Sequence, residues 1–170
     1  MSFTDGIFLL FFPALMAFAA SSDLVTMTIS NRISIALVAG FIAFALMLGL
    51  PPNVIGWHLA AGFLVLTCTF GMFAMGWIGG GDAKLAAATA VWCGFGVLIE
   101  YSLISSVLGG GLTLLILNAR GYILPEFARR WPWLMHLHDS KTGIPYGIAL
   151  AAAGLIVFPE TAIWKAVFAV

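Results

Sequence analysis

Residues 54–84 read VIGWHLAAGFLVLTCTFGMFAMGWIGGGDAK. The part from Val54 to Trp77 is almost entirely apolar and is long enough to cross a bilayer as a helix, which takes about 20 residues. It is followed by the run Gly79-Gly80-Gly81 and then by Asp82. An aspartate at bilayer depth costs roughly 2.5 kcal/mol or more, so a carboxylate at this position needs a structural or chemical reason.

Similar apolar runs extend in both directions from this stretch. They cover residues 6–22, 33–50, 82–96, 97–117 and 144–158, and the last continues toward residue 170. The chain is 62% hydrophobic, well above the roughly 45–50% of an ordinary soluble domain. We therefore predict an all-α polytopic membrane protein, a bundle of about six transmembrane helices that forms one domain over residues 1–170, without a separate soluble domain. The formal net charge of zero gives no reason to expect a nucleic-acid partner.

The charged residues predict how this bundle is oriented. Six spans place both termini on the same side of the bilayer, and basic residues gather in the connections on the other side: Arg32, Lys84, Arg120, Arg129, Arg130 and Lys141. Basic residues favour the cytoplasmic face, so we predict that both termini lie outside and that residues 118–143 form a cytoplasmic, interfacial connection. The same count places Asp23, which follows the first run, at the cytoplasmic boundary together with Asp82.

Two carboxylates at one membrane face are a candidate acid–base pair. Carboxylates held close together in a low-dielectric site cannot both ionise easily. The ionised one can take a proton from water while the protonated one polarises a substrate carbonyl, which hydrolyses a peptide bond without a metal. Glycines before Asp82 would let a substrate strand approach the backbone closely. The residues alone leave a plainer reading open, in which Asp23 merely ends the first helix and Asp82 caps the fourth.

Three sequence elements, taken in order, resemble the type IV prepilin peptidases, a family of membrane aspartic proteases. Gly79-Gly80-Gly81-Asp82-Ala83-Lys84-Leu85 is similar to the family signature G-x-G-D-x-K-L. Asp23, followed by Ile29 and Asn31, resembles the first catalytic segment of the family. Ile144-Pro145-Tyr146-Gly147 resembles a third element. The order and spacing of the three elements match, and together they cover essentially the whole chain.

The resemblance implies a membrane-embedded aspartic endopeptidase that cleaves the short basic leader of prepilins at the cytoplasmic face of the bacterial inner membrane. Asp23 and Asp82 would form the catalytic dyad, Gly79 and Gly81 would shape the loop that meets the substrate, and Lys84 would follow the second aspartate. The Lys84 cation either favours the ionised form of a nearby carboxylate or serves as a cytoplasmic anchor. The implied partners are a prepilin substrate, the lipid bilayer and the pilus assembly machinery, and no cofactor is implied.

Two departures from the family pattern refine this expectation. Ser30 stands where the family often has proline. Longer members carry a cytoplasmic insert with paired cysteines and a linked N-methylation activity, and Asp23 comes too early in this chain for such an insert. The resemblance is therefore to the short branch that serves tight-adherence (Flp-type) pili, which favours proteolysis alone and puts methyltransferase activity in doubt.

The remaining cysteines and histidines favour structural roles over a metal site. Cys68 and Cys93 are single residues in apolar runs, with no metal-ligand spacing between them, so we predict that both are buried small hydrophobic residues. His136 and His138 fit either a metal-binding tract or, together with the tryptophans and leucines around them, an interfacial amphipathic segment. We favour the interfacial segment.

Two other classes of function fit the composition. A small ion or proton transporter would use the aspartates to bind cations or relay protons, although a relay needs groups near the midplane and both carboxylates are predicted at one face. A non-catalytic subunit of a pilus secretion machine would tolerate the loss of both carboxylates.

Overall fold

The structure is a computed structural model that describes residues 3–125 and 130–168. These residues form α-helices joined by connections and contain no β-strand, which confirms the all-helical class. In chain order the helices are α1 (Phe3–Thr26), α2 (Asn31–Met47), α3 (Pro52–Ala74), α4 (Gly80–Arg120), α5 (Pro132–His138), α6 (Tyr146–Val157) and α7 (Ala162–Phe168), with the short 3-10 helix η2 (Phe158–Glu160) before α7. Arg129, one of the basic residues used to orient the bundle, lies outside the described residues.

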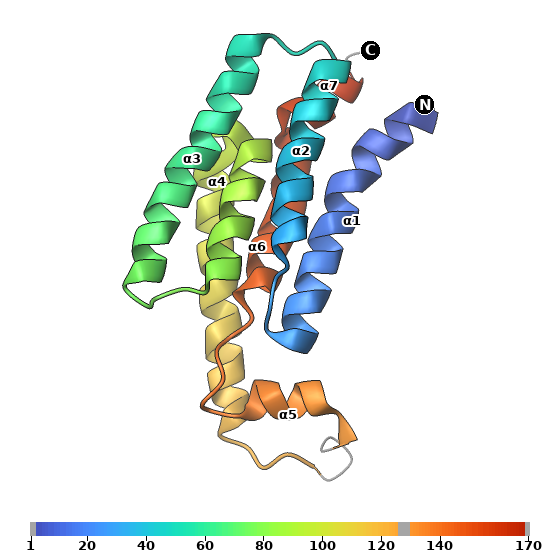
Figure 1. Cartoon of the computed structure of the whole chain (residues 1–170). Coiled ribbons are helices and arrows are strands. Elements are labelled where there is room, and N and C mark those ends of the chain that lie inside the picture. Colours follow the sequence, from blue (N-terminus) through green and yellow to red (C-terminus); the bar gives the residue numbers. More distant parts are fainter. Residues whose placement is uncertain (1–2, 126–129, 169–170) are drawn as a thin grey trace.

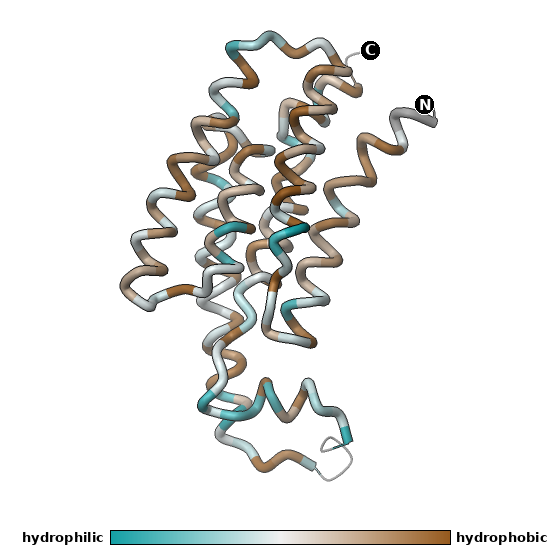
Figure 2. The backbone as a smooth tube through the Cα atoms, in the orientation of Figure 1, coloured by the Kyte–Doolittle hydropathy of each residue, from teal (hydrophilic) through white to brown (hydrophobic). Residues whose placement is uncertain are grey.

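Most of the helices suit a membrane. Within the described residues, four helical stretches are long and apolar enough to cross one: Gly6–Thr26, Pro52–Ala74, Gly80–Arg120 and Tyr146–Phe168. Helix α2 is also apolar but has only 17 residues. Hydrophobic colour runs along these helices in Figure 2, whereas hydrophilic colour is frequent around α5. The chain is therefore built as a multi-pass membrane protein.

Helix α4 is not one continuous rod, because the chain turns back on itself at Gly94 (Figure 1). Gly94 has φ 59° and ψ 177°, outside the helical region. A Cβ atom at this position would lie 2.6 Å from Cε1 of His58. Glycine adopts a positive φ without the steric cost that a side chain brings. The two halves of α4 correspond to the separate apolar runs predicted at 82–96 and 97–117.

The two ends of the chain lie at the same end of the bundle (Figure 1). The α1–α2 connection, the α3–α4 connection and the segment that contains α5 lie toward the opposite end, which we call the loop end. The Gly94 turn and the α2–α3 connection lie at the end that holds the termini. The basic residues Arg32, Lys84 and Arg120 therefore belong to the loop end, as the alternation of the apolar runs predicts.

An aromatic cluster away from the loop end holds the helices together. Trp92 in α4 is fully buried and donates its Nε1–H to the carbonyl of Leu37 in α2 at 2.9 Å. Its ring packs against Phe12 of α1 and Phe41 of α2, with centroids 4.9 and 5.9 Å apart. Buried aromatic rings contribute large apolar contact areas. The cluster therefore fixes α1 and α4, the two helices that carry the aspartates.

Two predicted helix boundaries were wrong at the positions that matter most. The first run predicts a helix that stops before Asp23, but α1 continues to Thr26, since the N–H of Met27 still bonds to the carbonyl of Asp23 at 2.8 Å. The fourth run predicts a start at Asp82 or Ala83, but α4 begins at Gly80. Both aspartates therefore lie within a terminal turn of a helix, where the backbone holds them more firmly than a loop would.

Candidate active site

Asp23 lies in the last turn of α1 and is buried, with 5% of its surface exposed. Its Oδ2 accepts a hydrogen bond from the backbone N–H of Gly147 at 2.8 Å. Gly147 is the second residue of α6, and the first amides of a helix have no partner within it. The carboxylate therefore satisfies one of these free amides, and the bond fixes the orientation of the Asp23 side chain.

Gly147 also makes this approach possible because it has no side chain. A Cβ atom at Gly147 would lie 2.8 Å from Oδ2 of Asp23 and 2.7 Å from Cδ1 of Ile29. Real Cβ atoms essentially never come this close to another heavy atom. Three segments that are distant in the sequence meet here: the end of α1, the α1–α2 connection and the start of α6. These are the segments that carry two of the three elements in the family resemblance.

Asp82 lies in the first turn of α4, and the N-cap of this helix is Gly79, which makes no side-chain cap. Asp82 is therefore not the N-cap residue of the fourth helix, as the plainer reading expected, but a residue of its first turn. A Cβ atom at Gly79 would lie 2.8 Å from Oδ2 of Asp82. The absence of a side chain at Gly79 thus leaves room for the carboxylate, which folds back over the start of its own helix.

The two aspartates line the same cavity, whose volume is about 390 Å³. Its other walls come from the α1–α2 and α3–α4 connections and from the segment that leads into α6, including Met27, Gly76, Gly79, Ile144 and Tyr146. Met27 and Gly76 both have positive φ, 53° and 75°. Positive φ is uncommon outside glycine, so the backbone at Met27 is held in a strained turn beside the site. The cavity brings both carboxylates to the loop end of the bundle.

A second cavity, of about 450 Å³, adjoins the first and shares Asp82 and Tyr146 with it. Its lining carries hydroxyl groups from Thr69 of α3 and from Tyr101 and Ser105 of α4. The hydroxyl of Tyr146 receives a hydrogen bond from Thr113 at 3.0 Å. Asp82 therefore lies where the two cavities meet.

Gly81 allows a close contact between the start of α4 and the α1–α2 connection. A Cβ atom at Gly81 would lie 3.2 Å from Cβ of Ile29 and 3.4 Å from its backbone nitrogen. These distances are tight, so a side chain would push the two segments apart. The glycines at 79 and 81 thus act on different neighbours: Gly79 makes room for the Asp82 carboxylate, and Gly81 brings the connection after Asp23 against α4.

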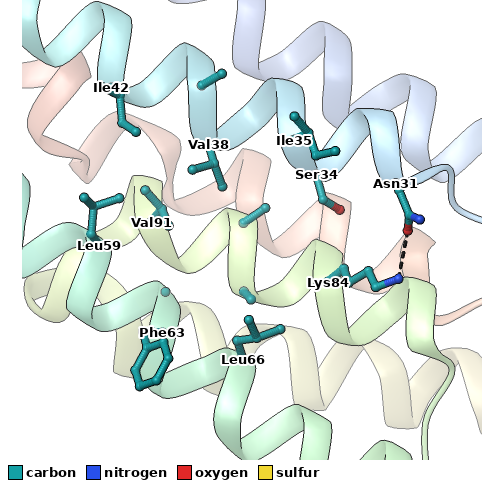
Figure 3. A pocket seen from close by; sticks show the side chains of 14 residues that line it. Asn31, Ser34, Ile35, Val38, Ile42, Leu59, Phe63, Leu66, Lys84 and Val91 are labelled. Carbon is teal, nitrogen blue, oxygen red and sulfur yellow. Dashed lines mark hydrogen bonds between the residues drawn. The ribbon is translucent and has the colours of Figure 1, made fainter.

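Lys84 does not line the cavity of the aspartates. Its Nζ donates a hydrogen bond to Oδ1 of Asn31, the first residue of α2, at 2.9 Å (Figure 3). Both residues line a different cavity, between α2, α3 and α4. Two residues of the family resemblance, Asn31 and Lys84, are therefore partners of each other. A role for Lys84 in binding substrate stays a prediction.

Arg120, which the sequence identified only as a positive charge, holds the segment that leads into the site. Its Nε donates to the carbonyl of Leu137 at 2.9 Å, and its Nη2 donates to the carbonyls of Thr142 and Gly143 at 3.2 and 3.0 Å. Gly143 lines the cavity of the aspartates. No sequence pattern could have predicted this role, because every residue has a backbone carbonyl and residue types therefore do not identify the acceptors.

The predicted interfacial segment contains the short helix α5, which lies at the loop end and has no buried residues (Figure 1). His136 and His138 are in its last turn. Among the described residues, no group of three or more histidine, cysteine, aspartate or glutamate side chains is placed to hold a metal. Cys93 is buried in α4, as predicted, whereas Cys68 is exposed on α3, so its predicted burial is wrong. Neither forms a disulfide.

Comparison with known proteins relates the chain to one family. The model of the type IV leader peptidase family matches residues 10–114, a range that includes both aspartates and the glycine run. A prepilin leader peptidase/N-methyltransferase from Xanthomonas campestris pv. campestris is 37% identical over 81 residues, which are 48% of this chain and 23% of that protein. The match thus spans less than a quarter of the relative's length. No solved structure matches the chain.

Proposed function

This chain belongs to the type IV leader peptidase family, and we propose that it is a membrane-embedded aspartic endopeptidase that removes the leader peptide of prepilins. The observation that carries this proposal is the shared cavity of Asp23 and Asp82, whose carboxylates come from different helices to one end of the bundle. A prepilin, with its leader outside the bilayer and an apolar helix within it, is the substrate whose scissile bond would reach this end.

The chemistry follows from the arrangement of the two carboxylates. One aspartate, ionised, takes a proton from a water molecule in the cavity, while the other, protonated, donates to the carbonyl oxygen of the scissile peptide. The water oxygen bonds to the carbonyl carbon, and the tetrahedral intermediate then releases the amine with a proton from the dyad. The Gly147 amide keeps Oδ2 of Asp23 in place, which leaves its Oδ1 for water or substrate.

We propose Gly79, Gly81 and Lys84 as the residues that receive the substrate, each in a different way. Gly79 lines the cavity, and its backbone has no side chain that would keep an extended substrate away. Gly81 is packed against Ile29, so its contribution is to shape the loop rather than to contact the scissile bond. Lys84 is exposed two residues after Asp82, where its cation would meet a substrate only outside the dyad cavity.

We propose that residues 1–170 form one peptidase domain with six membrane crossings, in which the two halves of α4 cross separately. Both termini then lie outside, and the loop end, with the dyad and residues 118–143, faces the cytoplasm. The exposed basic residues Arg32, Lys84 and Lys141 support this orientation, because basic residues favour the cytoplasmic face. In this family a bacterial inner membrane is the expected location.

We further propose that the chain serves Flp-type pili, with the pilus assembly machinery as its partner, and that it does not methylate its product. In residues 1–170 the two cysteines lie singly in α3 and α4, so they supply no paired-cysteine insert of the kind expected in the methylating members. This proposal predicts that a processed pilin carries no added methyl group when S-adenosylmethionine is present.

The proposal is tested with the purified full chain in liposomes and a prepilin that carries its leader, analysed by mass spectrometry. Asp23→Asn and Asp82→Asn each abolish removal of the leader, while both variants insert into the membrane like the parent protein. Gly56→Ala, at a position of α3 where a Cβ atom meets nothing within 4 Å, cleaves normally. Normal processing by either Asn variant would overturn the mechanism, and an aspartate-dependent ion flux without any cleavage would favour a transporter instead.

A further inference from the structure

A groove on the bundle remains unexplained by the peptidase site. It lies between α2, α3 and α4, has a volume of about 660 Å³ and is almost wholly apolar (Figure 3). We call it the α2–α3 groove, and it is lined by Asn31, Ile35 and Ile42 of α2, Phe63 of α3, and Lys84 and Val91 of α4, among others. Ile35 and Phe63 are 66% and 72% exposed, so the groove opens sideways, toward where the lipid would be.

The groove exists because α2 and α3 both pack on α4 and stand apart from each other. Gly62 explains the close contact of α3 with α4, since a Cβ atom there would lie only 2.3 Å from Cγ2 of Val91. Next to this contact, the ring of His58 bonds to the carbonyl of Val91 at 2.8 Å. These two contacts hold the α3 wall against α4, which forms the floor of the groove.

The dimensions of the groove fit an acyl chain better than a helix. It extends along α2 from Asn31 to Ile42, about 16 Å at a rise of 1.5 Å per residue. The hydrocarbon core of a bilayer is about 30 Å thick, so this length corresponds to one leaflet. One acyl chain of a lipid therefore fills the groove, whereas a transmembrane helix of a substrate would extend well beyond it.

The polar groups of the groove are confined to its loop end. Asn31, Ser34 and Lys84 lie together there, and apolar side chains line the rest (Figure 3). The Lys84 ammonium has three N–H donors, one of which bonds to Asn31 at 2.9 Å. The Oγ of Ser34, one helical turn further in, is buried and has no hydrogen-bond partner in the part of the chain that the structure describes. An exposed cation at the loop end, followed by an apolar channel, matches the order of a phosphate and an acyl chain in a phospholipid.

We propose that the α2–α3 groove is a binding site for an anionic phospholipid. One acyl chain lies along Ile35 and Ile42, and the phosphate accepts hydrogen bonds from the free donors of Lys84. Lys84 follows Asp82 by two residues near the start of α4, so the bound lipid is held close to the turn that carries a proposed catalytic residue. The test of this lipid site does not depend on the proposed peptidase function, because lipid binding is measured in the absence of a prepilin.

The test is native mass spectrometry of the purified full chain in detergent, titrated with dioleoylphosphatidylglycerol or with dioleoylphosphatidylcholine. We expect one phosphatidylglycerol molecule to be retained in preference to phosphatidylcholine. Lys84→Gln weakens the phosphatidylglycerol complex about fivefold, as expected for one basic side chain at a membrane surface, and Lys84→Arg keeps it. Ala39→Trp, which fills the groove from an exposed position of α2, removes the retained lipid of either kind.

Two control variants and the contrary outcomes complete this test. Lys141→Gln removes another exposed cation outside the groove, and Leu46→Trp adds a ring to an exposed position of α2 outside it. Both keep the lipid. Equal retention of the two lipids, or a Lys84→Gln variant that binds like the parent chain, would overturn the proposal. Crosslinking to the apolar helix of a prepilin provides a third contrary outcome. If Ala39→Trp keeps its lipid but no longer crosslinks to this helix, the groove binds the substrate helix and the proposal is overturned.

Discussion

The backbone N–H of Gly147 donates a hydrogen bond to Oδ2 of Asp23 at 2.8 Å, across 124 positions of the chain. It joins the start of α6 to the last turn of α1, next to the cavity that Asp23 shares with Asp82. The bond connects an element of the family resemblance that had no assigned role, Ile144–Gly147, to a proposed catalytic carboxylate. It also makes the position of Asp23 depend on a residue outside the range matched by the family model.

Gly147→Ala is expected to displace the Asp23 carboxylate. The added Cβ atom would lie 2.8 Å from Oδ2 of Asp23, so either the side chain or the start of α6 has to move. A misplacement of about 1 Å in an active site can cost roughly 100-fold in rate, and we expect a loss of that order in prepilin cleavage. The check is kcat/KM with the purified variant in liposomes, with Gly56→Ala as a matched glycine control. A Gly147→Ala enzyme as fast as the parent would show that the bond is dispensable.

Gly79→Ala and Gly81→Ala are expected to differ in severity. The Cβ atom at position 79 would lie 2.8 Å from Oδ2 of Asp82, whereas that at position 81 would lie 3.2 Å from Cβ of Ile29. The first substitution acts on the proposed catalytic group itself, and the second requires only a small shift between two segments. We therefore expect Gly79→Ala to lose roughly 100-fold in kcat/KM and Gly81→Ala to lose less. The reverse order would mean that the loop contact matters more than the room around the carboxylate.

Arg120 is expected to act as a positioning residue through the segment that it holds. Arg120→Gln removes the guanidinium that bonds to the carbonyls of Leu137, Thr142 and Gly143. Hydrogen exchange of residues 137–146 should become faster, and kcat/KM should fall about tenfold, which is about 1.4 kcal/mol and close to the lower end of the range for a hydrogen bond to a charged group. Arg120→Lys should retain little of the parent activity, because an ammonium lacks the planar fork of hydrogen-bond donors that a guanidinium has. Lys141→Gln is the control for charge, and unchanged exchange in Arg120→Gln would refute this role.

Gly94→Ala is expected to destabilise the bundle rather than change the chemistry. The residue has φ 59° and ψ 177°, a backbone region that is essentially restricted to glycine and costs other residues about 1–3 kcal/mol, and its Cβ atom would meet the ring of His58 at 2.6 Å. We expect a lower apparent melting temperature in detergent, measured by the loss of helical circular dichroism. Gly96→Ala is the control, since a Cβ atom there meets nothing within 4 Å. Equal melting of the two variants would mean that the turn tolerates a side chain.

The helices and the membrane class could be predicted from the sequence because hydropathy is a local property. The run from Val54 to Trp77 predicts most of α3, and the runs at 82–96 and 97–117 predict the two halves of α4, although the break lies at Gly94, inside the first of them. The ends of the helices were less predictable. Asp23 and Asp82 lie inside terminal turns because backbone hydrogen bonds at Met27 and Ala83 continue each helix by a few residues, and residue type alone does not decide where the last bond forms.

The candidate site was predictable in its residues but not in its geometry. The glycine run and the two aspartates could be identified from the motif, and the glycines at 79 and 81 do lie in tight contacts. The bond of Lys84 to Asn31 could not be foreseen, because it depends on how α2 and α4 lie against each other. The sequence also offered no reason to single out Arg120, whose partners are backbone carbonyls.

The sequence by itself determined that this chain is a helical membrane protein with two carboxylates at the ends of apolar runs, since burial of apolar residues in lipid depends on composition along short segments. The tertiary structure decided that the two carboxylates share a cavity, that the Gly147 amide holds one of them, and that a groove remains between α2 and α3. These features depend on which helices pack together, and that depends on contacts such as those of Trp92, Gly62 and Gly94 between residues far apart in the chain. A local sequence pattern does not indicate such contacts, so they can be identified only from the tertiary structure.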